Sequence, residues 1–168
     1  YVSVSDPVVA LTHVEVIDGT GAAPASDQTV VLDHGTIASI GASTGAQIPD
    51  GATILDLHGD TVYPGLVGMH EHLFYVEPGN AALNDTYGAP ITETGPRLYL
   101  AAGITTARTT GSMAPYADLN ARQAIEAGLE PGPDFDITGP YLEGEGSAIH
   151  QLHGLTGAAD ATRTVDYW

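Results

Sequence analysis

The segment "PGLVGMHEHLF", from Pro64 to Phe74, decides how the rest of the chain is interpreted. A Pro-Gly turn precedes a short apolar run, and this run ends in His70 and His72 with Glu71 between them. Alternate side chains of a β-strand point to the same face, so the two imidazoles are expected to lie together while Glu71 points away. Two imidazoles on a rigid strand can bind one metal ion, and imidazole suits zinc, iron, nickel or cobalt. The segment therefore predicts that His70 and His72 are metal ligands.

The residues before this segment have the pattern of a β-rich domain. Residues 9–19 are rich in branched apolar side chains and end in an Asp-Gly turn signal. Residues 29–41 predict a hairpin that turns at residues 33–35, because Gly follows Asp and His between two apolar arms. Residues 52–65 repeat the pattern around His58, Gly59 and Asp60, which predicts a second hairpin. Short strands at this spacing favour a small sheet or sandwich.

After Pro64 the pattern alternates between strands and helices. Helices are expected over residues 94–102 and 115–127 and from residue 156 onward, because Gly103 and Gly128 stand where helices stop and Pro115 stands where one starts. Strands are expected over residues 104–111 and 135–140. This alternation favours parallel strands with right-handed crossovers.

These elements predict an α/β chain in two parts. Residues 1–62 are expected to be the N-terminal part of a composite, β-sandwich-like domain, and residues 63–168 the first three βα units of a distorted (β/α)8 TIM barrel. A closed barrel needs about 250 residues, so the remainder of the barrel is expected in another segment or polypeptide.

Composition excludes several functions. Twenty-one acidic residues against four arginines give a net charge of −17, which disfavours nucleic acid and anionic membranes as partners. The absence of cysteine excludes disulfides, thiolate metal sites and a cysteine nucleophile. No apolar run approaches the roughly 18 residues of a membrane span. A soluble protein is expected, either cytoplasmic or exported with its signal removed; the compartment stays open.

The wider segment "VYPGLVGMHEHLF" resembles the first-strand signature of the amidohydrolase superfamily. Further likenesses to that family are found in "VEVIDGTG", "GTIASIG", "LAAGITTART" and "AIEAGLEPGPDFDITGPYL". The resemblance implies a metal-dependent hydrolase that cleaves an amide, peptide-like or cyclic amide bond (EC 3.5 or 3.4) through metal-activated water. It implies that His70 and His72 bind one or two divalent ions, zinc being the expected metal.

The resemblance also implies ligands that this chain does not supply. Two-metal members carry a carboxylated lysine on the fourth strand, histidines on later strands and an aspartate on the eighth. The chain contains no lysine, so these ligands and the catalytic base are expected beyond residue 168. The expected partners are the remainder of the barrel, a small-molecule or peptide-like substrate, and further copies of the protein in a homo-oligomer.

Three other residues, two histidines and an arginine, are candidates for the site or its surroundings. His150 and His153 lie in the glycine-rich stretch "YLEGEGSAIHQLHG", expected at the same barrel end as the strand histidines. They are candidates for substrate contact, with solvent-facing loop histidines as the alternative. Arg108, near the end of a strand, is expected to form an ion pair within the barrel wall, with orientation of a substrate carboxylate as the alternative.

A different class of protein also fits the central motif. The string "HEHLFYVE" resembles part of a cupin motif, in which His70, His72 and Glu77 would bind one metal inside an all-β barrel. Pro78 counts against this alternative because proline interrupts strand pairing. The helical segments downstream count against it too.

Overall fold

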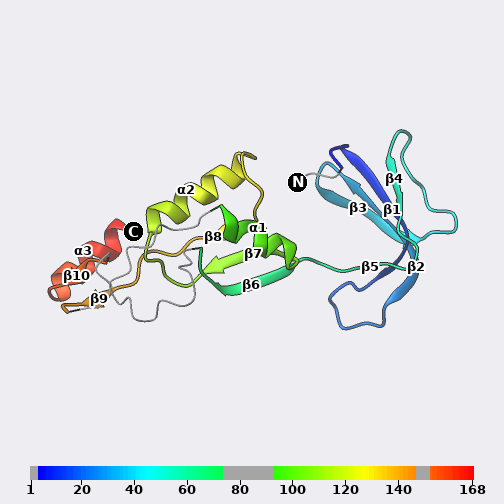
Figure 1. Cartoon of the computed structure of the whole chain (residues 1–168). Coiled ribbons are helices and arrows are strands. Elements are labelled where there is room, and N and C mark those ends of the chain that lie inside the picture. Colours follow the sequence, from blue (N-terminus) through cyan, green and yellow to red (C-terminus); the bar gives the residue numbers. More distant parts are fainter. Residues whose placement is uncertain (1–3, 74–92, 147–151) are drawn as a thin grey trace. The chain divides into compact units, whose positions relative to one another are not determined.

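The computed structural model describes residues 4–73, 93–146 and 152–168. Contacts divide the chain into two compact units, Tyr1–Pro64 and Gly65–Trp168 (Figure 1). Across the described ranges, no helix combines the length and the apolar character that crossing a membrane requires.

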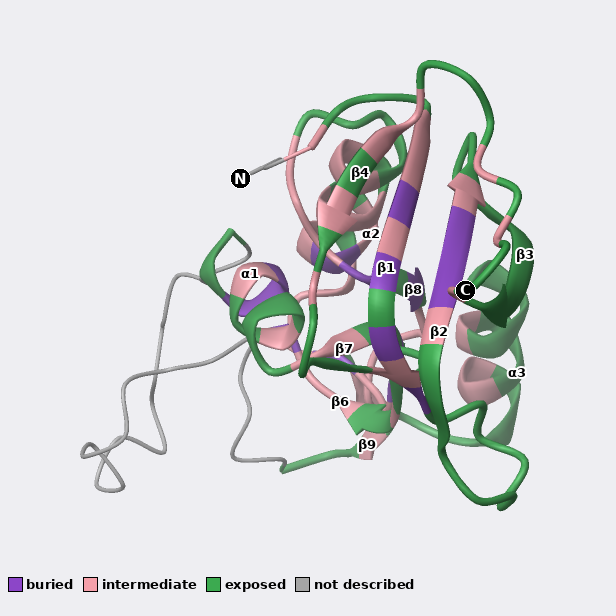
Figure 2. Cartoon of the chain, turned by 90° about the vertical axis from the view of Figure 1, so that its right-hand side faces the viewer, coloured by how far each residue is buried: buried purple, intermediate pink, exposed green. Residues whose placement is uncertain are grey.

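The first unit is a five-stranded sheet built around β1 (Val8–Val16). This strand pairs antiparallel with β2 (Ala25–Asp33), and β2 pairs antiparallel with β3 (Thr36–Ala42). On its other edge β1 pairs in parallel with β4 (Thr53–Asp56) and then with β5 (Thr61–Val62). Buried residues concentrate on β1 and β2 (Figure 2), so these two strands carry the core of the unit.

The core of this unit is a small apolar cluster of Val14, Val16 and Val30. The hairpin predicted between β2 and β3 is present, and His34 and Gly35 form its turn with φ of 46° and 78°. Two positive φ values in a two-residue loop are the geometry whose twist matches a β-hairpin, which explains why glycine stands there.

The second predicted hairpin is wrong. The chain does bend at His58 and Gly59, between β4 and β5. However, both strands pair with β1 and not with each other. The backbone explains this: Leu57 N donates to Thr12 O at 3.1 Å, and Glu15 N donates to Asp60 O at 3.0 Å. The bend therefore lets one extended segment follow β1, and the described part of the unit forms a single sheet rather than a sandwich.

The second unit contains a parallel three-stranded sheet. Its strand order is β6 (Leu66–Glu71), β7 (Ile104–Thr109) and β8 (Asp134–Asp136). Helix α1 (Thr94–Ala101) precedes β7, and α2 (Pro115–Glu126) connects β7 to β8. The predicted α/β alternation is confirmed, whereas the described residues form an open sheet and not a closed barrel. The helices and parallel pairing also disagree with the all-β cupin alternative.

The core of this sheet is formed by Leu73, Ala107 and Phe135, all almost fully buried. Ala121 and Ile125 of α2 pack against this cluster, which explains why they recur four residues apart. The core thus lies beside the carboxyl end of β6, where the two strand histidines are found.

The last described segments are short. Strands β9 (Glu143–Gly144) and β10 (Gly154–Leu155) pair in parallel, and α3 (Ala158–Tyr167) follows. The helix predicted from residue 156 onward is present, and no residue of α3 is buried; Val165 is exposed.

Candidate metal centre

His70 and His72 lie side by side at the carboxyl end of β6. Their ring centroids are 5.4 Å apart and the rings meet edge to face. His70 is the last but one residue of the strand, and His72 follows its end directly. Parallel pairing of Glu71 with Thr109, together with the bond from Thr110 N to Glu71 O at 3.2 Å, fixes the backbone between the two histidines.

This spacing fits two imidazoles that share one metal ion. With a metal–nitrogen distance of about 2.0–2.1 Å and a tetrahedral angle, the ring centroids of two such ligands are about 5 Å apart. The donor chemistry suits a divalent transition metal. Within the ranges that the structure describes, no group of three or more metal-binding side chains gathers.

Two tyrosines hold His72, and sequence reasoning singled out neither. The backbone N–H of His72 donates to Tyr99 Oη at 3.3 Å, and that hydroxyl donates to His72 O at 2.9 Å. Tyr141 Oη lies 3.3 Å from His72 Nδ1. Tyr99 stands on α1 and packs against Phe135, whereas Tyr141 follows β8. The parallel order of the strands, which brings their carboxyl ends to one edge, was the only signal that could have indicated Tyr141.

A buried carboxylate, Asp118, lies near the same histidine. It is fully buried in the first turn of α2, and neither oxygen has a hydrogen-bond partner in the described structure. Burial raises the pKa of Asp118, and the neighbouring Ser112 hydroxyl and His72 oppose that shift. Sequence periodicity could have found this residue, because it precedes Ala121 and Ile125 on one helical face by three and seven positions.

The other predicted residues have partners of their own or lie outside the described ranges. Arg108 forms the expected ion pair, with its Nε 3.1 Å from Asp136 Oδ2 on the neighbouring strand. His153 Nε2 lies 2.8 Å from Asp160 Oδ2 on α3. Glu77, a ligand in the cupin alternative, lies outside the described residues. His150, the other candidate histidine of the loop, does too.

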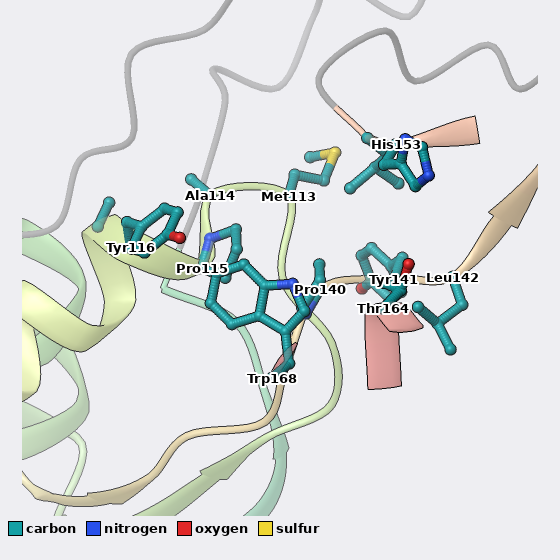
Figure 3. Close-up of a pocket in the computed structure, with 12 residues that line it drawn as sticks. Met113, Ala114, Pro115, Tyr116, Pro140, Tyr141, Leu142, His153, Thr164 and Trp168 are labelled. Carbon is teal, nitrogen blue, oxygen red and sulfur yellow. The ribbon is translucent and has the colours of Figure 1, made fainter. Parts of the chain in front are cut away.

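Tyr141 also borders a pocket of about 360 Å³ (Figure 3). Its wall is mainly apolar and aromatic, and it comes from the segments after β7 and β8, the start of α2, the residues before β10, and the C-terminal part of α3 with the residue after it. The lining residues are Met113, Ala114, Pro115, Tyr116, Ala117, Pro140, Tyr141, Leu142, Leu152, His153, Thr164 and Trp168. Tyr141 therefore connects the candidate metal centre to a space large enough for a small apolar group.

Comparison with known proteins is consistent with this arrangement. The fold matches the crystal structure of a protein from Bifidobacterium longum assigned as a prolidase, with a TM-score of 0.74 and 28% identity over 95% of the chain. It also matches phenylurea hydrolase B, with a TM-score of 0.67 and 29% identity over 95% of the chain. A stretch of 52 residues is 46% identical to imidazolonepropionase from Cupriavidus necator, which is 29% of this chain and 12% of that protein. No family model matches the chain.

These similar proteins are enzymes of the amidohydrolase superfamily, which confirms the resemblance first seen in the H-x-H segment. The chain spans 37% of the length of the Bifidobacterium structure and 36% of that of phenylurea hydrolase B.

Proposed function

We propose that this chain supplies the first two metal ligands of a metal-dependent hydrolase that cleaves amide, peptide-like or cyclic amide bonds. The 5.4 Å separation of the His70 and His72 rings carries the proposal, because it suits two ligands of one ion. When bound, a divalent ion, zinc being the expected one, lowers the pKa of a water molecule and polarises the scissile carbonyl.

The chain's own residues prepare this site. Tyr99 and Tyr141 hold His72 at its backbone and at its ring. His70 at the end of β6 and His72 directly after it would hold an ion in place before substrate arrives, which is the preorganisation that hydrolysis needs. The names of the related proteins, among them prolidase and imidazolonepropionase, support an amide-type substrate.

The remaining parts of the site are proposed to come from residues outside this chain. We propose that residues outside this chain complete the β-domain and close the (β/α)8 barrel. They would also supply the further metal ligands and the catalytic base. This proposal is supported by the open three-stranded sheet, by the lack of a third metal-binding side chain among the described residues and by the relatives' greater length.

Metal content and hydrolysis by the full-length protein test the proposal together. The purified protein is assayed on a panel of dipeptides, N-acyl amino acids and cyclic amides, before and after chelation and after zinc is restored. We expect chelation to abolish hydrolysis and zinc to restore it. His70→Ala and His72→Ala should each lose metal and activity, whereas His34→Ala, in an exposed turn, should keep both. Full activity and metal content in the His70→Ala and His72→Ala variants would refute the ligand assignment.

A further inference from the structure

The contact between Tyr141 and His72 joins two strands that are not neighbours in the sheet. Tyr141 follows β8, the third strand of the sheet, and its hydroxyl reaches the imidazole that ends β6, the first. Tyr141 N donates to Ser112 O at 3.1 Å, which ties the backbone of the tyrosine to the segment after β7. Three strand ends are thus linked through one residue, by its side chain and its backbone.

The segment after β7 leaves the space in which the Tyr141 ring packs, here called the seat of the ring. Gly111 has a φ of +97°, and a Cβ placed on it would lie 2.4 Å from Cε1 of Tyr141. Only glycine accepts both this backbone and this close approach. Gly111 N donates to Thr138 Oγ1 at 2.7 Å, and Thr138 Oγ1 lies 3.0 Å from Thr109 Oγ1. The glycine that admits the ring is therefore itself fixed between β7 and β8.

The contact between His72 Nδ1 and Tyr141 Oη couples the tautomer of His72 to the tyrosine, because the tautomer decides which of the two atoms donates. A histidine that binds a metal usually donates its other ring N–H to a fixed acceptor, which sets the ring's orientation and leaves a lone pair on the ligating nitrogen. The Tyr141 hydroxyl lies 3.3 Å from His72 Nδ1, and a hydroxyl oxygen can accept such a bond. Nδ1–H of His72 donating to Tyr141 Oη leaves the lone pair on Nε2.

We propose that Tyr141 is a positioning residue that holds His72 in the tautomer and orientation required for binding a divalent metal ion, and that Gly111 is required to seat it. This inference rests on the proposed metal-dependent function. Tyr99 has a different task, because its hydroxyl bonds only to backbone atoms of His72 in the contacts described above. Removing the Tyr141 hydroxyl should therefore change the ring of His72 without moving its backbone.

Tyr141→Phe in the full-length protein tests the role of the hydroxyl. Its dissociation constant for Zn²⁺, measured by competition with a chromophoric chelator, should rise about 10- to 100-fold. Tyr116→Phe is the matched control, because Tyr116 borders the same pocket and its exposed hydroxyl contacts Tyr167 instead of His72. This control should bind Zn²⁺ as the wild type does.

A second readout separates positioning from general damage to the fold. In the metal-free protein labelled with ¹⁵N-histidine, the ring shifts of His72 should show a proton on Nδ1 in the wild type. In Tyr141→Phe they should show a mixture of tautomers or the other one. Unchanged Zn²⁺ affinity together with an unchanged tautomer would overturn the inference. If the His70→Ala and His72→Ala variants bind Zn²⁺ as tightly as the wild type, the proposed function is overturned, and this inference with it.

Gly111→Ala tests the seat of the ring. Gly128→Ala is its control, because Gly128 also has a positive φ, +69°, but a Cβ there would meet nothing within 4 Å. Gly111→Ala should weaken Zn²⁺ binding at least as much as Tyr141→Phe, and Gly128→Ala should leave it unchanged. Combining Gly111→Ala with Tyr141→Phe should weaken binding by less than the product of the single effects, since both act through one contact. Equal Zn²⁺ affinities of the Gly111→Ala and Gly128→Ala proteins would refute the seating role.

Discussion

Replacing Gly65 by alanine should disturb the strand that carries the histidines. Gly65 directly precedes β6, and Leu66 N donates to Gly103 O at 2.9 Å, so the two strands start close together. A Cβ at Gly65 would lie 1.9 Å from Oγ1, 2.5 Å from Cγ2 and 2.7 Å from Cβ of Thr105. Rotating the threonine side chain moves the first two atoms but not its Cβ. The backbone of β6 or β7 must therefore shift, which we expect to cost about 1–3 kcal/mol.

Urea unfolding of the full-length protein measures this cost. Gly41→Ala is the control, because Gly41 also lies at a strand position and a Cβ there would meet nothing within 4 Å. In a background of Thr105→Gly, which removes the opposing Cβ, the cost of Gly65→Ala should fall by at least about half. A Gly65→Ala protein as stable as Gly41→Ala, or a cost that does not depend on Thr105, would refute this reasoning.

Three further predictions concern charged residues of the second unit. Arg108→Ala should lower the free energy of unfolding by no more than about 1 kcal/mol, because its ion pair with Asp136 is half exposed; a loss well above that in urea unfolding would contradict the assignment. Asp118→Asn should raise stability at pH 7 by about 1–3 kcal/mol, since the amide carries no buried charge. Because the folded-state pKa of Asp118 is raised, the wild type loses stability relative to this variant as pH rises above the ordinary value of 3.8. A variant that is less stable than the wild type at pH 7 would mean that the carboxylate has a partner. The Thr156 N–H donates to Asp160 and, with His153, lowers the pKa of Asp160 to about 2. The stability this carboxylate provides is therefore present above pH 3.8 and lost as pH falls toward about 2, and the NMR shift of the Thr156 amide should titrate near the lower value, not near 3.8.

Local signals predicted those features that depend on local geometry. The β2–β3 turn follows from a glycine in a position that needs positive φ, and α2 begins at Pro115 and ends before Gly128 as expected. The pairing of His70 and His72 follows from strand alternation alone, and the rings do lie together. Each of these depends on residues only a few positions apart.

Features that depend on distant residues could not be predicted in the same way. The bend at His58 and Gly59 is as compatible with a hairpin as with an extended segment, and only pairing with β1 decides between them. Tyr141 is 69 residues from His72 in the chain, and no periodicity connects them. The candidate site is therefore predictable as far as its two ligands, whereas the side chains that hold those ligands needed the folded structure.

Anomalous X-ray scattering from crystals of the full-length protein grown with zinc tests the central claim most directly. The ligand assignment predicts one zinc peak about 2.0–2.1 Å from a ring nitrogen of His70 and from a ring nitrogen of His72. A zinc peak within binding distance of only one of these rings would contradict the ligand assignment. So would a zinc peak elsewhere with none at either ring.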